Sequence, residues 1–544
     1  MFVREKVNKS GIVSVQVIAK INGQSRLLKT IGSSRDKLVI SELVLKGQEF
    51  IDSYAGQQRF GFSEDPQSVR SVFESISSHT EVGTAMLLGK IFDEVGFDAI
   101  PQEIFRQLVM SRLRHPVSKL RTSDYLDKYH ELEYPVQQIY RYMDKFHTFQ
   151  KELVQQISYT HTLEILGGEI HVVFYDVTTL YFEIDQEDEI RRTGFSKEGK
   201  HQNPQIVLGL LVSKNGYPLA YDIFEGNKFE GHTMLPVIDS FKAKYRLKQL
   251  VIIADSGLLS NANIEELTHG GYEFILGARI KNEKKDIQRK ILALNLQNGE
   301  SAMIEKGDLR LVVTYAESRA GKDHRNREKG LRKLEKQIKT GQLTKSNINN
   351  RGYNKYLKMD GQVKITIDYQ KFNQDALWDG LKGYLTNAKL SKEEIIENYG
   401  HLWQIEKAFR ISKHDLRIRP IYHRLRRRIE THICISFAAY KIYKELERQL
   451  KEKQSNLSAE KAIEIAKTIY QIKAKTTNGE VSHIMLLTDE QRLLAKLFDF
   501  GETIRHLQVN FCDIGLIGSL SVEPELRKIL CHQRFNSSFG GLVN

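Results

Sequence analysis

The segment "HVVFYDVTTLYFE" (residues 171–183) places an acidic residue directly after a short apolar run. The β-branched and aromatic residues from Val172 to Tyr175 predict a buried strand that ends on Asp176. Burying a lone carboxylate is costly unless another group pairs with it or a reaction uses it. Asp176 is therefore the first candidate for a functional residue.

After Asp176, apolar runs alternate with helical patterns. The apolar runs predict further strands at 205–212, 219–224, 249–255 and 272–278, and the helical patterns predict helices at 233–245 and in "NANIEELTHGG". The pair Asn215-Gly216 favours a hairpin between the second and third strands. The resulting order, β-β-β-α-β-α-β, predicts a mixed sheet in which helical crossovers follow an antiparallel meander.

A second predicted strand of this sheet also ends on an aspartate, Asp255. Ligands of open α/β sheets bind outside the carboxyl ends of strands, so Asp176 and Asp255 converge if the first and fourth strands are neighbours. Two close carboxylates repel each other unless they share a proton or a cation. Magnesium takes oxygen ligands of this kind.

A third acid, Glu406, lies on a predicted helix from Lys392 to about Lys413. At helical spacing it shares one stripe with Tyr399, Trp403, Arg410 and Lys413. Taken singly, an aspartate after a strand is usually a turn or cap residue, and Glu406 equally fits a salt-bridged helix. Together, the three acids suit two-metal phosphoryl transfer, in which two ions lie about 4 Å apart.

The flanking regions differ from this core. Residues 1–58 predict a small basic β unit with a hairpin at Asn22-Gly23, and residues 59–165 predict basic helices that either read DNA or present a solvated face. Thirteen Lys/Arg and three Asp/Glu between Arg319 and Lys358 predict a charged helix with a loop, or partial disorder. Residues 441–544 predict a mainly helical region.

The bulk properties of the chain fit a multidomain protein of the cytoplasm. Its 544 residues suggest several domains, and its three cysteines lie too far apart to indicate a disulfide framework or a CxxC zinc site. No apolar run is long enough to predict a membrane span, and the first residues lack a signal peptide pattern. The formal net charge of +13 fits nucleic acid as a partner, or simply solubility.

These motifs resemble one known family. "YDVTTLYF" with Asp176, "ADSG" with Asp255, and the spacing Tyr399, Glu406, Lys413 resemble bacterial insertion-sequence transposases of the DDE type that carry a Tyr-Arg-Glu-Lys signature. "EGNKFEGHT" (225–233) also resembles the Gly-Asn stretch of that class. The resemblance covers about 170–440 well.

The resemblance implies a fold and a domain layout. It implies an α/β catalytic core with an RNase H-like mixed sheet and a β-containing insertion, flanked by the small β unit and helical domains. The first part of the core would span 166–282, the basic insertion 283–375, and the second part with the catalytic helix 376–440. Recognition of the element's ends would fall to the helical residues 59–165.

The resemblance also implies an activity. Asp176, Asp255 and Glu406 would bind two Mg²⁺ ions, for which Mn²⁺ would substitute, and would nick DNA at the ends of an insertion sequence. The exposed 3′-hydroxyls would then attack target DNA in the same site. The partners would be the terminal inverted repeats and target DNA, held by a homodimer on DNA, and Tyr399 and Lys413 would hold phosphates.

The chain departs from the signature at one position, because Leu402 stands where the signature has arginine. Arg410, one helical turn after Glu406, is a candidate substitute cation. Trp403 either stacks on a displaced base or packs in the core, and core packing is the preferred alternative. Nine Lys/Arg and one acid between 407 and 428 predict phosphate contacts, among them Arg417 and Arg419, which position DNA without reading its sequence.

Other functions remain open at this stage. An RNase H-like nuclease that only cuts would use the same acids, and a domesticated transposase would bind DNA without catalysis. Glu225, at the end of the third strand, is an alternative third ligand. A structural RNA-binding protein has no support, since the sequence has no RRM-type aromatic motif.

Overall fold

The computed structural model describes residues 1–8, 11–21, 24–54, 71, 73–145, 148–196, 199–247, 250–258, 260–349, 351–360, 364–476 and 479–500. These residues form two compact units, one comprising Met1–His79 and Ile472–His483, and the other comprising the described residues of Thr80–Gln471 and Ile484–Asn544. The predicted Asn22-Gly23 turn and the end of the predicted C-terminal helical region, from residue 501, lie outside the described residues.

The first unit contains the predicted N-terminal β structure. Strands β1 (Phe2–Val7), β2 (Val13–Ile21) and β3 (Gln24–Ser34) form an antiparallel sheet in sequence order. Val15 and Val17 of β2 are fully buried, and helix α1 (Lys37–Tyr54), which the sequence analysis did not predict, packs on this sheet. A second small sheet has the order β16-β15-β4, with β4 at Ile76–Glu81, β15 at Tyr470–Thr476 and β16 at Gly479–Met485.

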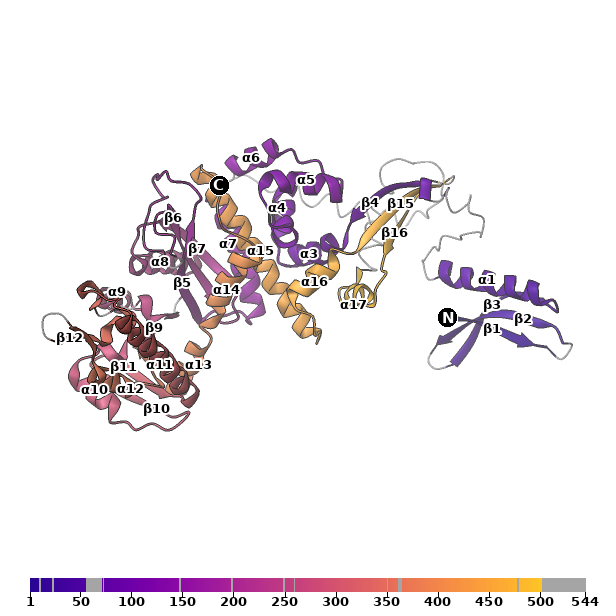
Figure 1. Ribbon diagram of the computed structural model, residues 1–544. Helices are drawn as coiled ribbons and strands as arrows, with labels where there is room; N and C mark the ends of the chain where they lie inside the picture. Colours follow the sequence, from indigo (N-terminus) through magenta and orange to yellow (C-terminus); the bar gives the residue numbers. More distant parts are fainter. Residues whose placement is uncertain are drawn as a thin grey trace, which may run out of the picture. The chain divides into compact units, whose positions relative to one another are not determined.

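The second unit begins with helices, as predicted. They are α3 (Gly83–Glu94), the 3-10 turn η1 (Phe97–Ala99), α4 (Glu103–Arg114), α5 (Lys119–His130), α6 (Val136–Lys145) and α7 (Thr148–Ile165). The rings of Phe92, Phe97 and Phe105 pack together at centroid distances of 5.5 to 6.4 Å. The 27-residue helix α15 (Arg426–Glu452) contacts α3, α4, α6 and α7, so it joins this bundle to the rest of the unit (Figure 1).

An eight-stranded mixed sheet forms the centre of the second unit. Its order is β10-β11-β14-β9-β8-β5-β6-β7. The strands are β5 (Val172–Tyr181), β6 (Gln205–Ser213), β7 (Pro218–Glu225), β8 (Val251–Ala254), β9 (Glu273–Ala278), β10 (Ser301–Lys306), β11 (Leu309–Tyr315) and β14 (Leu381–Thr386). The antiparallel β5-β6-β7 meander and the parallel pairs β5/β8 and β8/β9 confirm the predicted mixed sheet.

Helices cover both faces of this sheet. Helices α8 (Met234–Tyr245) and α9 (Asn261–His269) follow β7 and β8 and pack with Val173 and Tyr175 of β5. On the other face, Phe174 and Leu180 of β5 pack in one cluster with residues of α14 (Trp403–His414) and α15. The two clusters alternate along β5 as expected for a strand buried on both faces.

One part of the predicted insertion at 283–375 belongs to the main sheet, and the other part lies outside it. Strand β11 pairs with β14 and β10 pairs with β11, so both extend the sheet, which the sequence analysis did not predict. The predicted charged helix is α11 (Glu317–Lys339), and β12 (Leu357–Asp360) and β13 (Lys364–Ile367) form a separate hairpin. Short helices complete this part: α10 (Lys285–Leu292), α12 (Tyr369–Ala376) and the 3-10 turns η5 (Lys345–Asn347) and η6 (Gly352–Tyr356).

The predicted single helix from Lys392 to Lys413 is two helices. Helix α13 (Lys392–Gly400) begins at the predicted residue, after a capping box of Ser391 and Glu394, but it ends at Gly400. The amide of Leu402 then bonds to Tyr399 O, and the amide of Ile405 to Leu402 O, so a tighter turn separates α13 from α14. The remaining helices are α16 (Ala459–Ala466) and α17 (Asp489–Leu497).

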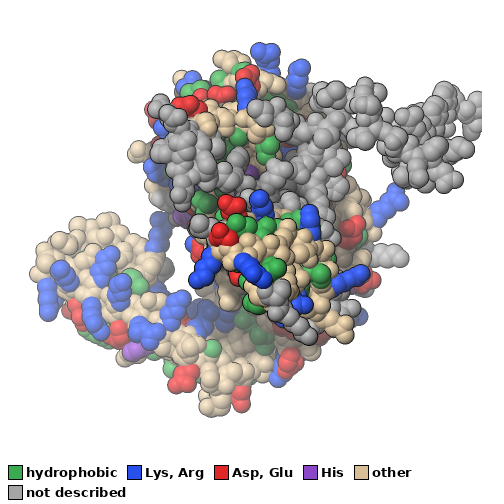
Figure 2. All heavy atoms as spheres, turned by 90° about the vertical axis from the view of Figure 1, so that its right-hand side faces the viewer, with side chains coloured by type: hydrophobic (Ala, Val, Ile, Leu, Met, Phe, Trp, Pro, Cys, Tyr) green, Lys and Arg blue, Asp and Glu red, His purple; other side chains and the backbone are tan. Residues whose placement is uncertain are grey.

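Among the described residues, no helix is both long and apolar enough to span a bilayer. Lysine and arginine side chains are spread over the face shown in Figure 2, with acidic side chains between them. The basic side chains visible on this face therefore do not form one uniform patch.

Candidate active site

Asp176 lies in the middle of β5 instead of ending it. The strand continues to Tyr181, and Asp176 pairs with Leu210 of β6. This corrects the prediction of a strand at 172–176: Val177 and Leu180 are buried and keep the chain in the sheet beyond the polar position. Asp176 is itself half-buried, and it shares a strand face with Phe174, the face on which α14 packs.

Asp255 follows the last residue of β8 and is exposed. Strands β5 and β8 are parallel neighbours in which Tyr175 pairs with Ala254. Asp176 and Asp255 therefore directly follow paired residues of adjacent strands, and the condition set for their convergence, that the first and fourth strands are neighbours, is met. Two carboxylates at this sheet edge offer the oxygen donors that a divalent metal ion prefers.

Glu406 lies in the first turn of α14 and is exposed. Its charge and that of Asp255 act on the same two groups, the Tyr399 hydroxyl and the Lys382 ammonium. Helix α14 packs against β5 and β6, which brings Glu406 to the sheet face that carries Asp176. However, within the described part of the chain no group of three or more His, Cys, Asp or Glu side chains is close enough to hold a metal ion.

Tyr399 connects the helices to Asp255. Its side chain is buried, and its hydroxyl donates a hydrogen bond of 3.3 Å to Asp255 Oδ1. Burial raises the pKa of this hydroxyl above its ordinary value, and the charge of Asp255 raises it further. Tyr399 therefore stays protonated and serves as a donor to Asp255, a contact that the sequence analysis did not predict.

Glycine at position 277 makes room for Tyr399. Gly277 of β9 pairs with Tyr384 of β14, and a Cβ at position 277 would lie 2.5 Å from Tyr399 Oη and 3.0 Å from the Ser256 amide nitrogen. A glycine inside a strand pattern often marks such a close approach. That signal was present in the sequence but was not used.

Lys382 is the second residue that sequence reasoning missed. Its ammonium lies 4.5 Å from the ring centroid of Tyr399 and 5.2 Å from that of Tyr384. Burial lowers the pKa of Lys382, and the nearby Arg319 lowers it further, whereas Asp255 and Glu406 act in the opposite direction. Lys382 thus brings a cation to the two acids from β14, a strand that carried no predicted site residue.

The predicted DNA-contacting residues of α14 lie in different environments. Trp403 is 50% exposed and near Lys407, so the preferred core-packing prediction for this side chain is wrong. Arg410 is exposed, and its positive charge opposes the rise that burial causes in the pKa values of Asp415 and Tyr443. Lys413 is half-buried. Leu402, at the departing signature position, is buried in the core.

The basic segment after α14 is partly tied to the sheet. Arg417 is exposed with a backbone φ of 45°, and Arg419 lies half-buried over the ring of Tyr181. Glu225, the alternative third ligand, ends the edge strand β7 and has β6 between it and β5. This position does not favour it over Glu406 as a partner of Asp255.

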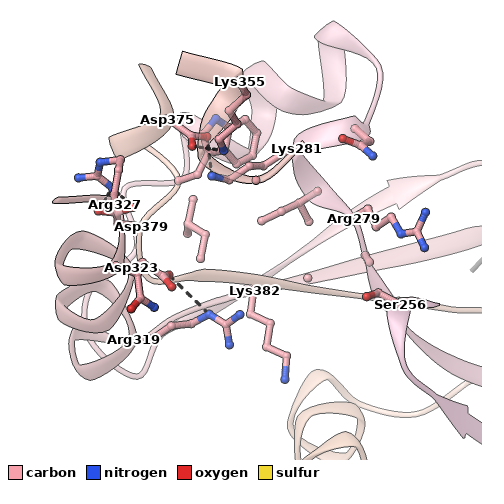
Figure 3. Close-up of a pocket in the computed structure, with 18 of the residues that line it drawn as sticks. Ser256, Arg279, Lys281, Arg319, Asp323, Arg327, Lys355, Asp375, Asp379 and Lys382 are labelled. Atoms are coloured by element: carbon pink, nitrogen blue, oxygen red, sulfur yellow. Dashed lines mark hydrogen bonds and ion pairs between the residues drawn. The ribbon is translucent and has the colours of Figure 1, made fainter. Parts of the chain in front are cut away.

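An open cleft of about 840 Å³ begins beside Ser256, the residue after Asp255. One wall is formed by the ends of β9 and β14, and the other by α11, η6 and the residues around α12 (Figure 3). Its charged lining residues are Arg279, Lys281, Arg319, Asp323, Arg327, Lys355, Asp375, Asp379 and Lys382. Cations outnumber acids in this lining, next to the proposed catalytic carboxylates.

Comparisons with known proteins give the family of this chain. No curated protein matches it. A solved piggyBac transposase synaptic complex with hairpin DNA aligns at 9% identity over 85% of this chain and 90% of that chain, with a TM-score of 0.37, which is too low to establish a shared fold. The family described as the transposase DDE domain matches residues 168–442, slightly more than half of the 544 residues and a span that includes Asp176, Asp255 and Glu406. The chain therefore belongs to the transposase DDE domain family.

Proposed function

We propose that this transposase cuts DNA at the ends of an insertion sequence and joins the freed 3′-hydroxyls to target DNA. The observation that carries the proposal is that Asp176 and Asp255 directly follow the paired residues Tyr175 and Ala254 of parallel strands, with Asp255 bonded to Tyr399. Family membership supports it, because the matched segment contains all three proposed catalytic acids. The terminal inverted repeats, a homodimer on DNA and the bacterial signature class are parts of this proposal.

The two aspartates fit a divalent metal ion, with Glu406 as the proposed third ligand. Mg²⁺, or Mn²⁺ in its place, would supply Lewis-acid chemistry at the attacking and leaving oxygens of a phosphodiester. In this structure the two aspartates each follow a residue of the last β5/β8 pair, Tyr175 and Ala254, whereas Glu406 belongs to a separate helix. Whether Glu406 can join the two aspartates as a metal ligand therefore depends on the position of α14 against β5.

The protein's own groups position the site. The Tyr399 hydroxyl donates to Asp255 Oδ1 and so limits the rotation of that carboxylate. The Lys382 ammonium brings a positive charge to the same edge, which would favour the approach of a phosphate. Exposed Trp403 is available to stack on an unpaired base, and Arg417 and Arg419 would position the DNA backbone.

Cleavage and strand transfer by the full chain test the proposal. The substrate would carry the ends of the element that encodes this chain, with Mg²⁺ or Mn²⁺, and the variants would be Asp255→Asn and Glu406→Gln. Loss of metal assistance removes several kcal/mol of transition-state stabilisation, so both variants should lose roughly a thousandfold in nicking and joining while still binding DNA.

Glu397→Gln is the matched control, because Glu397 is an exposed glutamate of α13 paired with Lys214 at 3.1 Å. It should keep full activity. Unchanged activity in Glu406→Gln would remove Glu406 from the site. Nicking without joining would favour the nuclease, and DNA binding without cleavage under either metal would favour the non-catalytic alternative.

A further inference from the structure

The cleft beside Asp255 has two differently charged parts (Figure 3). In the part away from the sheet, acids and bases neutralise one another. Asp375 accepts from Lys281 and Lys355, each at 2.6 Å, and Asp379 pairs with Arg327. These contacts hold α11, η6 and α12 together, so their charges are already compensated.

In the part next to Ser256, the cations are not compensated in this way. Neither Arg279 nor Lys382 forms a hydrogen bond or ion pair with a carboxylate among the described residues, and Asp255 and Glu406 reach Lys382 only through longer-range charge. Arg279 is exposed, directly after β9, and Lys382 is half-buried on the neighbouring strand β14. Both side chains are therefore available to an anion that enters the cleft.

A third cation, Arg319, lies at the same end of the cleft. It is about half exposed and lies 3.8 Å from Asp323, a loose contact, while Asp323 also accepts from the Gly380 amide. Arg319 and Lys382 are close enough to repel each other. Like charges held together at an open surface are stabilised when an anion binds between them.

We propose that Arg279, Arg319 and Lys382 bind the phosphodiester backbone of one DNA strand as it leaves the Asp255 carboxylate. The inference rests on the proposed function, since it gives the path of the substrate at that site. The open cleft of about 840 Å³ has room for a short run of nucleotides of one strand.

This assignment also accounts for the departure at position 402. Leu402 is 7% exposed and packs in the core, so it cannot contact a phosphate. The cation that the signature places on the catalytic helix is supplied here from the sheet, by Lys382 of β14, and by Arg279 and Arg319 around it.

The test is the salt dependence of DNA binding by the full-length chain in EDTA, where no cleavage is needed. The probes are a fluorescent single-stranded oligonucleotide and the duplex of the same sequence. The variants are Arg279→Gln and the double variant Arg279→Gln/Lys382→Gln. Each lost phosphate contact on a single strand lowers the slope of log affinity against log salt by about 0.7, so the double variant should lose about 1.4 in slope and roughly tenfold in affinity.

Lys281→Gln is the matched control, because Lys281 lines the same cleft but is already paired with Asp375. It should bind the single strand as the unaltered chain does. Equal melting temperatures of the variants and the unaltered chain show that the variants fold. If the double variant does not fold, the single variant Arg279→Gln, at an exposed position, tests the proposal alone, and it should lose about 0.7 in slope.

Unchanged slopes in the variants would overturn the proposal, even if the chain transposes DNA. An equal loss of slope for the duplex and the single strand would also overturn it, because the proposal places one unpaired strand in the cleft. Conversely, a selective loss of single-strand binding in a chain that never cleaves DNA would uphold this site and reject the proposed function.

Discussion

The two halves of the eight-stranded sheet are stabilised by different interactions. Strand β6 is buried at all nine positions, whereas β10 is half-exposed at most of its positions. On the β5-β6-β7 side, two large apolar clusters fill both faces, whereas on the β14 side two smaller apolar clusters, one around Leu311 and one around Leu334, are supplemented by ion pairs such as Arg327–Asp379. The proposed catalytic aspartates lie on the boundary, on β5 and directly after β8.

This difference separates two roles. Asp176 is placed by packing, which is insensitive to salt, so its position relative to Asp255 is fixed by the sheet register. The walls of the cleft are joined partly by charges, which salt screens and which also attract the proposed substrate. A transposase that must bind and release DNA benefits when the salt-sensitive charges lie in the cleft and not around the proposed catalytic aspartates.

The largest expected effect is on the packed half. Phe174 is fully buried on the same strand face as Asp176, in a cluster with Ile405 and Phe409 of α14. Phe174→Ala should lower the free energy of unfolding by about 3–5 kcal/mol, because it leaves a cavity between β5 and α14. Urea unfolding would measure it.

The control for this variant is Phe195→Ala, since Phe195 is 73% exposed. That change should cost less than about 0.5 kcal/mol. A similarly small loss for Phe174→Ala would contradict the view that packing holds α14 and Asp176 in place.

A smaller effect on stability is expected on the β14 side of the sheet. The Arg327 side chain is 8% exposed and pairs with Asp379. Asp379→Asn leaves this buried guanidinium without a carboxylate and should therefore lower the free energy of unfolding by about 3 kcal/mol. The double variant Arg327→Met/Asp379→Asn should be less destabilised than the single one, since it removes the uncompensated charge. Thermal unfolding compares the two.

The exposed pair Arg492–Asp489 provides the contrast, and Asp489→Asn there should change stability by less than about 1 kcal/mol. If Asp379→Asn were equally mild, the pair at α11 would be only a surface contact. The view that ion pairs add to the smaller apolar clusters on the β14 side would then fail.

Much of the sheet could be predicted because its strands are short apolar runs separated by turn residues. The runs at 205–212, 219–224 and 272–278 became β6, β7 and β9 within one or two residues. The end of β5 was missed because Asp176 interrupts the apolar run, although Val177 and Leu180 are buried beyond it. Tertiary burial, which local patterns do not reveal, keeps those residues in the strand.

The cleft could not be predicted, for a related reason. Its walls are joined by pairs far apart in sequence, such as Lys281 with Asp375 and Arg327 with Asp379. Nothing local distinguishes these side chains from other charges in a basic segment. In contrast, the end of α13 could have been found, since Gly400 stands at the break between the two helices.

The smallest effect concerns the boundary between the halves, where Tyr399 bonds to Asp255. Tyr399→Phe removes one hydrogen bond of 3.3 Å to an exposed carboxylate. It should slow nicking about fivefold, which corresponds to about 1 kcal/mol, with little change in DNA affinity. A single-turnover nicking assay would separate the two quantities, and a rate equal to that of the unaltered chain would show that Asp255 needs no such donor.

Gly277→Ala sharpens this result, because its effect depends on the same hydroxyl. A Cβ at position 277 lies 2.5 Å from Tyr399 Oη, so alanine there must displace the tyrosine or the strand. In the Tyr399→Phe background that oxygen is gone, and only the 3.0 Å approach to the Ser256 amide remains. The two changes should therefore be non-additive, with Gly277→Ala costing less nicking activity in the phenylalanine variant than alone. Strict additivity would mean that the glycine serves the strand pairing with Tyr384 and not the contact between Tyr399 and Asp255.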